Sequence, residues 1–361
     1  MRLTVLGVGL IGGSIGLAAR KRLDAEVRGF DPDKEVAERA LELGALDSTA
    51  PSVAEACEAA EIVFCAAPVG ALPTLAAEAL EATGPDAVVT DVGSTKRELI
   101  AGLGETERFI GGHPLAGAET SGVENARADL FEGARWYLTP TERSQGTLYD
   151  RLQRAVADLG ARPQAIDAET HDRVMASVSH LPHVLANVLA ARAAESLGDS
   201  SERLPDVGPS FRDTARVAGA NPGIWTDIFL TNREAVAGEA EALAERLREA
   251  AALLREGDSE RVAAWHREAL ADRRALLETE LSGGPLAEVR VSVPNKPGVV
   301  AELALELGKA GVNIEDMALH PAADNRSGAI SLWIAGPEES ERAAEVVRGL
   351  GYAVTLLRSE T

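Results

Sequence analysis

The chain has 361 residues, enough for two or three domains that each bury a core of their own. Hydrophobic residues make up 45% of it and charged residues 26%, which excludes a mainly disordered chain, a collagen-like repeat and a disulfide-dense miniprotein. With 57 acidic against 36 basic side chains, the formal net charge is −21. This charge argues against a nucleic-acid partner and against an anionic membrane surface.

The two cysteines, Cys57 and Cys65, stand in apolar surroundings. We expect two free, buried thiols in a reduced compartment and no metal ligation by them. The apolar N-terminus lacks the features of a signal peptide, and no uninterrupted apolar run reaches the roughly 18 residues of a membrane span. These features predict a cytoplasmic protein without a membrane partner.

Short apolar runs alternate with helical patterns over the first part of the chain. Strands are predicted at residues 3–6, 27–30, 62–66, 88–91 and 109–111, and helices at residues 34–43 and 72–82 among the intervening segments. Strand–helix alternation of this kind indicates βαβ units around a parallel sheet. We therefore place the chain in the α/β class.

Two further regions of different composition follow along the chain. Residues 168–281 are rich in Ala, Leu, Glu and Arg, show helical periodicity and include a helix that Gly257 ends. After a linker, Ser282–Pro285, the predicted elements are a strand at 287–293, a helix at 299–311, a strand at 329–335, a helix at 339–351 and a strand at 353–357. The predicted domains are thus a parallel-sheet domain at 1–167, an all-helical domain at 168–283 and an α+β domain at 286–361.

A glycine motif follows the first predicted strand. Gly7, Gly9 and Gly12 form a G-x-G-x-x-G pattern before a helix, which suits a tight turn, a close approach of a pyrophosphate and close helix–strand packing. Asp31 ends the second strand, where a carboxylate binds ribose hydroxyls and repels a 2′-phosphate. The pattern predicts a Rossmann-type domain that binds NAD. The predicted cofactor residues are Gly7, Gly9, Leu10, Ile11, Gly12, Asp31, Ala67 and Pro68.

Polar side chains gather in four further segments, which are residues 91–96, 111–119, 179–183 and 211–225. In a dinucleotide-binding chain this set predicts a dehydrogenase, because a neutral histidine such as His113 accepts a hydroxyl proton and an arginine such as Arg216 grips a carboxylate. His180 and His183 share a helical face, but no convincing ligand partner stands near them, and we predict no metal.

Three other histidines receive structural interpretations. We expect His171 and His266 to be solvated helix residues. We expect His320 to lie in a loop of the last domain.

The segments GVGLIGGSIGLA, DVGSTK, GGHPLAGAETSG, SHLPH and FRDTARVAGANPGIW, in this order, resemble the prephenate/arogenate dehydrogenase family of tyrosine biosynthesis. They extend over the first two predicted domains. The last part, with PNKPGVVAELALELGKAGVNIED, resembles an ACT domain. That is a βαββαβ unit that commonly pairs with a copy of itself and binds an amino acid.

The resemblance implies an NAD-dependent oxidative decarboxylation of prephenate to 4-hydroxyphenylpyruvate. It implies that His113 accepts the proton of the substrate's C4 hydroxyl, that Ser94 holds both groups, and that Arg216 grips a carboxylate. It also implies a homodimer formed through the helical region and feedback by L-tyrosine. The remaining residues it assigns are Ser179, His183 and Glu119 at the substrate and Asn313 and Ile314 at the effector.

Other functions stay open at this point. Arogenate carries an amino group where prephenate carries a keto group, and the same machinery would oxidise it. A 3-hydroxyacid or imine reductase would share the βαβ and helical frame, although it gives no reason for the HPLAG and SHLPH segments together. A non-catalytic regulator that senses NAD and an amino acid would need no proton acceptor.

Overall fold

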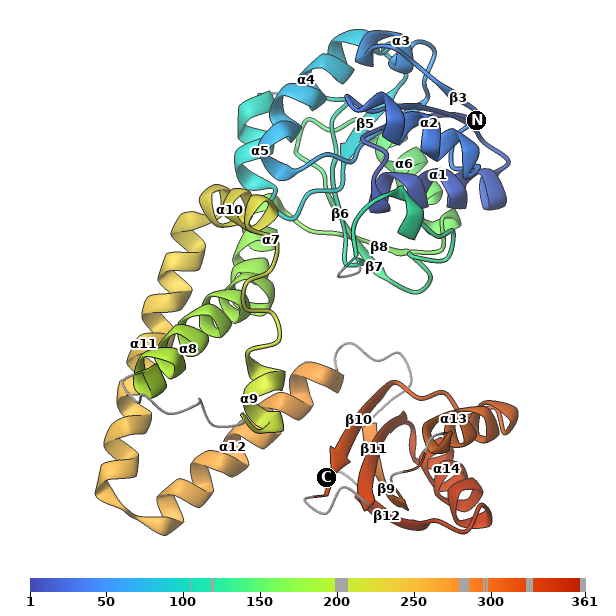
Figure 1. Cartoon of the computed structure of the whole chain (residues 1–361). Coiled ribbons are helices and arrows are strands. Elements are labelled where there is room, and N and C mark those ends of the chain that lie inside the picture. The colour runs from blue at the N-terminus through green and yellow to red at the C-terminus, as the bar shows by residue number, and fades with distance from the viewer. Residues whose placement is uncertain are drawn as a thin grey trace. The chain divides into compact units, whose positions relative to one another are not determined.

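The structure is a computed structural model that describes residues 1–104, 106–117, 120–198, 207–278, 286–294, 296, 298–322 and 327–357. The chain forms two compact units, Met1–Leu247 and Arg248–Thr361 (Figure 1). The first unit thus joins the predicted dinucleotide-binding part to most of the helical part. The finer division into three domains at 167 and 283 stays a prediction.

Five parallel strands form the main sheet of the first unit, in the order β3-β2-β1-β4-β5. This order reverses direction between β1 and β4, which is the point where a doubly wound sheet opens a crevice for ligands. The predicted parallel sheet is confirmed. The strands are β1 Arg2–Leu6, β2 Glu26–Phe30, β3 Ser48–Thr49, β4 Ile62–Cys65 and β5 Val88–Asp91.

Helices cover both faces of this sheet, because its strands are apolar on both sides. In β4, Phe64 faces one core and Val63 faces the other, as expected of a parallel strand buried on two faces. Figure 1 shows α1 and α6 on one side of the sheet and α3, α4 and α5 on the other. These helices and α2 are α1 Leu10–Leu23, α2 Lys34–Glu42, α3 Val53–Cys57, α4 Leu72–Ala82, α5 Arg97–Leu103 and α6 Gly146–Asp158.

The two cysteines lie in the core on the α3–α4 face. Both are free and buried, as predicted. Burial raises the pKa of the Cys57 thiol to about 12 and raises that of Cys65 well above its ordinary value. Both thiols therefore stay protonated and unreactive near neutral pH.

A second sheet of three strands, in the order β6-β7-β8, extends the first unit. The strands are β6 Gly111–Pro114, β7 Arg135–Thr139 and β8 Arg162–Ala165. The strand predicted at 109–111 was misplaced, since Phe109 makes only an isolated bridge to Val89 and the strand itself holds His113. β6 pairs antiparallel with β7 rather than continuing the parallel sheet.

The helical part follows β8. Its elements are α7 Ala168–Met175, a π-helical turn Ala176–His180, α8 Leu181–Gly198, α9 Pro209–Thr214, α10 Pro222–Thr231 and α11 Arg233–Glu256. Gly257, at φ +69°, ends α11 where the sequence predicted. The run Ala168–Ser196 is long and apolar enough to cross a membrane by length and composition alone, with 22% of the tested window buried.

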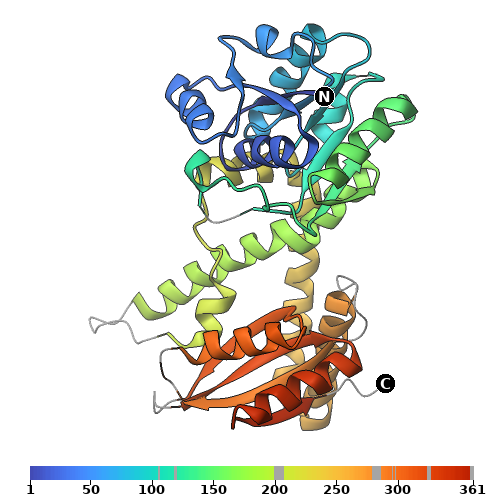
Figure 2. The ribbon, with the colours of Figure 1, turned by 90° about the vertical axis from the view of Figure 1, so that its right-hand side faces the viewer.

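The second unit contains a four-stranded antiparallel sheet in the order β10-β11-β9-β12. Figure 2 shows α13 and α14 along one face of this sheet, where they bury a core that includes Val291, Leu303 and Val347. The element order is βαββαβ. The elements are α12 Ser259–Glu278, β9 Leu286–Pro294, α13 Val299–Lys309, β10 Asp316–Pro321, β11 Ser327–Ala335, α14 Pro337–Gly349 and β12 Ala353–Leu357.

One histidine of this unit was misassigned. His320 lies within β10 and not in a loop, and its Nε2 is 3.2 Å from Oγ of Ser331 on β11. Strand β10 was not among the elements predicted from the sequence, and it pairs antiparallel with β11. His266 is exposed on α12, as predicted.

Candidate active site

The glycine turn between β1 and α1 leaves room for a ligand. Gly7 has a φ of +91°, and a β-carbon there would lie 2.6 Å from the carbonyl oxygen of Ala66. A β-carbon on Gly12 would lie 1.9 Å from the carbonyl oxygen of Gly7, whereas one on Gly9 would meet nothing within 4 Å. Gly9 is the N-cap of α1 and offers no side-chain cap. The turn therefore presents uncapped amide groups and open space to an anionic group.

Asp31 stands beside this turn. Its Oδ2 accepts a hydrogen bond from the backbone N–H of Val8 at 2.9 Å, and its Oδ1 accepts one from Asp33 at 3.0 Å. The two bonds fix the carboxylate at the end of β2, next to the glycine turn. This is the place where a ribose hydroxyl of a dinucleotide would lie. The residues present thus fit NAD.

Asp91 joins the loop after β5 to β6. Its Oδ2 accepts a hydrogen bond from the backbone of Gly93 at 2.8 Å, and its Oδ1 accepts one from Gly112 at 3.0 Å. Nζ of Lys96 pairs with the same carboxylate, and both side chains are fully buried. The carboxylate therefore holds Ser94, which follows Gly93, and His113, which follows Gly112, on two tied segments.

His113 lies at one end of a buried series of hydrogen-bonded side chains. Its Nδ1 is 2.9 Å from Nε2 of His171, and Nδ1 of His171 is 2.8 Å from Oδ1 of Asp172. Burial lowers the pKa of His113 well below its ordinary value, and the nearby His171, Lys96 and His180 lower it further. His113 is therefore neutral near pH 7 and able to accept a proton.

The expectation that His171 is a solvated helix residue is wrong. The side chain is 0% exposed on α7, and its ring also meets that of Tyr137 edge-on at 5.7 Å. Its neighbours along the chain include charged residues, so the local sequence predicts an amphipathic helix and does not indicate that the imidazole is buried. Only the packing of α7 against β7 brings it to His113.

A second polar chain starts from Asp172. Nδ2 of Asn232 donates to the backbone carbonyl of Asp172 at 2.7 Å and lies 3.2 Å from Nδ1 of His180. Burial lowers the pKa of His180 to about 4. Nε2 of His180 is buried and has no hydrogen-bond partner among the residues that the structure describes. His180 ends the π-helical turn, a local departure from the α-helix that is frequent at functional sites.

Three of the segments singled out in the sequence meet at one pocket of about 580 Å³. Gly117, from the HPLAG segment, lines it together with His183 and Arg216. The rings of His183 and Trp225 stack with centroids 3.4 Å apart. Burial and the charge of Arg216 lower the pKa of His183. The pocket thus combines a guanidinium, a neutral imidazole and aromatic surface, which suits a small ring that carries a carboxylate.

The other predicted residues have the following places. Ser94 and Ser179 are half-buried, in the loop after β5 and in the π-helical turn. Ala67 and Pro68 follow β4. Asn313 and Ile314 lie in the loop before β10, where Nδ2 of Asn313 donates to Glu315 at 2.8 Å. Glu119 lies outside the described residues.

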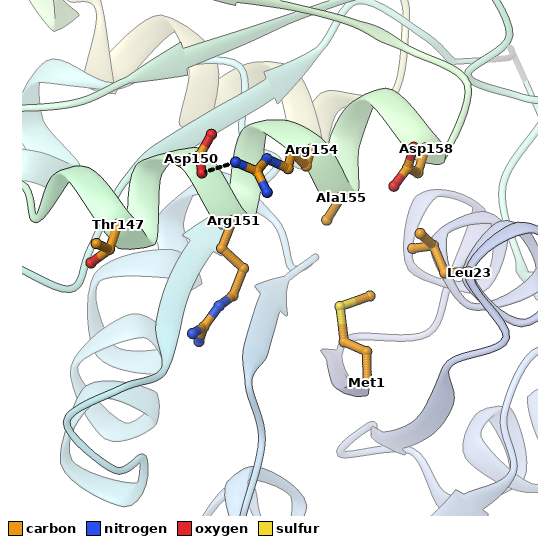
Figure 3. Close-up of a pocket in the computed structure, with 8 residues that line it drawn as sticks. All are labelled: Met1, Leu23, Thr147, Asp150, Arg151, Arg154, Ala155 and Asp158. Carbon is orange, nitrogen blue, oxygen red and sulfur yellow. Dashed lines mark hydrogen bonds and ion pairs between the residues drawn. The ribbon is translucent and has the colours of Figure 1, made fainter.

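Another hollow, of about 310 Å³, lies between α6 and the N-terminus (Figure 3). Arg154 and Asp150 form an ion pair at its edge, and Met1 reaches toward it from β1. Of the described residues that were predicted to bind cofactor or substrate, none lines this hollow. The 580 Å³ pocket is accordingly the better candidate for the substrate.

Comparison with known proteins agrees with this geometry. A family model for the nucleotide-binding domain of prephenate dehydrogenase matches residues 15–164, and one for the dimerization domain of prephenate dehydrogenase matches residues 167–268. The prephenate dehydrogenase of Lactococcus lactis is 33% identical over 309 residues, which cover 83% of this chain and 84% of that protein. The chain belongs to the prephenate dehydrogenase family.

Two further relatives of the family show how far the likeness extends. The prephenate dehydrogenase of Bacillus subtilis is 29% identical over 361 residues and covers 96% of each chain. A crystal structure of the prephenate dehydrogenase of Aquifex aeolicus, in complex with hydroxyphenyl propionate and NAD+, has a TM-score of 0.70 and 31% identity. It covers 76% of this chain and 98% of that one.

Membership of the prephenate dehydrogenase family makes the chain an NAD-dependent oxidoreductase. His113, His183 and Arg216 were predictable from the sequence, whereas His171, Asp172 and Asn232 were not. No motif marks these three residues. The one available signal was the pair His171–Asp172 near the start of the predicted helical domain, and local sequence cannot distinguish such a pair from solvated surface residues.

Proposed function

We propose that this chain oxidises and decarboxylates prephenate with NAD, and that His113 accepts the proton of the substrate hydroxyl. Membership of the prephenate dehydrogenase family supports the proposed reaction. The observation that carries the role of His113 is its burial with Nδ1 held by His171 at 2.9 Å, which leaves the other ring nitrogen to the substrate. A neutral, oriented imidazole is the group that such a reaction requires.

The proposed chemistry begins at C4 of the substrate. Nε2 of His113 takes the hydroxyl proton, which raises the electron density at C4 and eases the departure of hydride. NAD, when bound, accepts that hydride. The ring carboxylate then leaves as CO2 and its bonding pair enters the ring, so that the C4 oxygen becomes a phenolate. His113 returns the proton to this oxygen, and the balance closes without another acid or base.

Arg216 is proposed to grip a substrate carboxylate, because a guanidinium in a pocket pairs with a carboxylate through two parallel hydrogen bonds. His183, stacked on Trp225, presents a neutral ring to the same space. We propose further substrate contacts by Ser94, Ser179 and Glu119. For NAD we propose the glycine turn, Asp31 and the segment that follows β4, whose members are Gly7, Gly9, Leu10, Ile11, Gly12, Ala67 and Pro68.

We also propose a homodimer. The matched model for residues 167–268 describes a dimerization domain. Val178, in the π-helical turn, and Val188, on α8, are each 60% exposed, and a second copy would cover such side chains. The buried thiols and the relatives' biosynthetic role favour the cytoplasm.

The C-terminal unit is proposed to be an ACT domain that binds L-tyrosine. Its βαββαβ order and its sheet order support this proposal. Asn313 and Ile314 lie in the loop between α13 and β10, and we propose that backbone groups of this loop hold the ammonium and carboxylate of an amino acid. Regulation would require that L-tyrosine bind two states of the enzyme with different affinity.

NADH formation by the purified chain, with prephenate or arogenate and with or without L-tyrosine, tests these proposals. We expect turnover of prephenate that L-tyrosine slows. Turnover of arogenate alone would keep the role of His113 and overturn the substrate. Turnover that ignores L-tyrosine would overturn the regulatory proposal, and no turnover of either substrate would overturn the proposed function.

A further inference from the structure

We infer that His171 and Asp172 are positioning residues that hold His113 in the tautomer whose Nε2 accepts the proton, and that support its positive charge afterwards. This inference rests on the proposed function. It concerns two side chains that no sequence motif marks, and it follows from four hydrogen bonds around Asp172 and His171.

Asp172 is held by backbone hydrogen bonds at the start of α5. Its Oδ1 accepts the backbone N–H of Lys96 at 2.8 Å, and its Oδ2 accepts that of Arg97 at 2.9 Å. Burial raises the pKa of Asp172, but the hydrogen bonds from His171, Arg97 and Lys96 outweigh burial and lower the pKa overall. Asp172 is therefore an ionised carboxylate, which accepts hydrogen bonds and donates none.

The ionised Asp172 fixes the tautomers of His171 and His113. Since Asp172 only accepts, Nδ1 of His171 carries a proton and donates it to Oδ1. In neutral His171 the other nitrogen, Nε2, is then an acceptor. Nδ1 of His113 must therefore donate to it across the 2.9 Å contact. Nε2 of His113 is left with a free lone pair, which is the proton acceptor of the proposed reaction.

Asp172 also balances the positive charge that His113 gains during the reaction. When His113 gains a proton at Nε2, its Nδ1–H still faces the lone pair of His171, and the negative Asp172 stands behind that ring. Lys96, whose charge also acts on His113, pairs with the carboxylate of Asp91. The carboxylate of Asp172 is thus the counter-charge for a protonated His113, as in other acid–base sites where a carboxylate orients a histidine.

The surrounding elements hold the pair rigidly. Asp172 binds the first amides of α5 while it belongs to α7, so it ties the two helices together. The ring of His171 packs edge-on against Tyr137, the residue paired with His113 across β6 and β7. Asn232 closes the arrangement by donating to the backbone carbonyl of Asp172.

The test compares His171→Phe with His171→Gln in the full-length chain. Phenylalanine fills the space but cannot form the hydrogen bonds to His113 and Asp172. We therefore expect kcat to fall about 10²-fold, with the KM values for prephenate and NAD within twofold of those of the original chain. Glutamine accepts from His113 with its carbonyl and donates to Asp172 with its amide, and we expect it to restore kcat to within about tenfold of the original. Equal losses in both variants, or an unchanged kcat in His171→Phe, would overturn the inference.

A second comparison distinguishes positioning from general structural support. In a chain that already carries His113→Asn, adding His171→Phe is expected to change kcat by less than twofold, because the group it positions is gone. A further loss of the full size seen in the single variant would mean that His171 acts independently of His113, and it would overturn the inference.

A readout that needs no catalysis keeps this inference separate from the proposed function. Nitrogen NMR of the histidine-labelled chain near pH 7 should show His113 with a protonated Nδ1 and an unprotonated Nε2, and the protonated Nδ1 population should drop in His171→Phe. The opposite tautomer in the original chain would overturn the inference even if prephenate is oxidised. A failure of turnover with the expected tautomer would overturn the function alone.

Discussion

The imidazoles of His113 and His171 meet with 2.9 Å between Nδ1 and Nε2, although 58 residues separate them in the chain. One ring lies on β6 and the other on α7, and the centroids are 5.1 Å apart. The contact turns an isolated histidine into the end of a buried chain that leads to a carboxylate. It is the relationship on which the proposed chemistry depends most.

His113→Asn tests the proton acceptor. Asparagine preserves polarity but has no basic nitrogen, so we expect kcat to fall about 10²- to 10⁴-fold with little change in the KM for prephenate. Steady-state NADH formation measures both constants. The variant should bind NAD as before, since the glycine turn is untouched. Turnover equal to that of the original chain would remove His113 from the mechanism.

Arg216→Ala tests the carboxylate grip. Loss of a charged hydrogen-bonded contact costs about 1.5–3 kcal/mol, so the KM for prephenate should rise about ten- to a hundredfold. Arg212→Ala is the matched control, because Arg212 is exposed on α9, the short helix that precedes Arg216, and is not among the residues that line the pocket. An equal KM in the two variants would assign the carboxylate to another group.

Asp31→Ala tests cofactor selection. Without the carboxylate, the ribose loses a hydrogen-bond acceptor and a 2′-phosphate is no longer repelled, so the ratio of kcat/KM for NAD to that for NADP should fall. Asp33→Ala serves as the control, since Asp33 caps α2 and accepts from the backbone of Glu35. A preference that stays the same in Asp31→Ala would contradict its assignment.

The buried His180 predicts a pH-dependent stability. Its pKa is about 4 in the folded chain against an ordinary value of 6.5, so between these values the unfolded chain binds more protons. The contribution of His180 is complete above about pH 6.5 and is lost as the pH falls, by about 2 kcal/mol near pH 5.

Urea unfolding at about pH 7.5 and pH 5 measures this effect. His180→Gln should reduce the difference between the two midpoints. His266→Gln, on an exposed part of α12, should leave the difference as it is. A pH dependence that His180→Gln does not change would place the acid sensitivity in other groups.

Much of the fold was predictable because it is local. The G-x-G-x-x-G turn can be recognised from its glycines, since Gly7 needs a positive φ and Gly12 has no room for a β-carbon. The helix at Leu72–Ala82 and the end of α11 at Gly257 were also predicted correctly. The strands β7 and β8 were missed, because Arg135–Thr139 and Arg162–Ala165 show no clear period and acquire their strand character by pairing with each other.

From the amino-acid sequence it was possible to predict the dinucleotide turn, the Asp31 carboxylate beside it, the order of the motifs, and His113 and Arg216 as the candidate base and carboxylate-binding group. Each of these depends on residue type and spacing within one segment. The protonation of His113 depends instead on burial and on His171, Asp172 and Lys96, which come from other elements. Desolvation and hydrogen-bond direction are properties of packed neighbours, and only the tertiary structure brings those neighbours together.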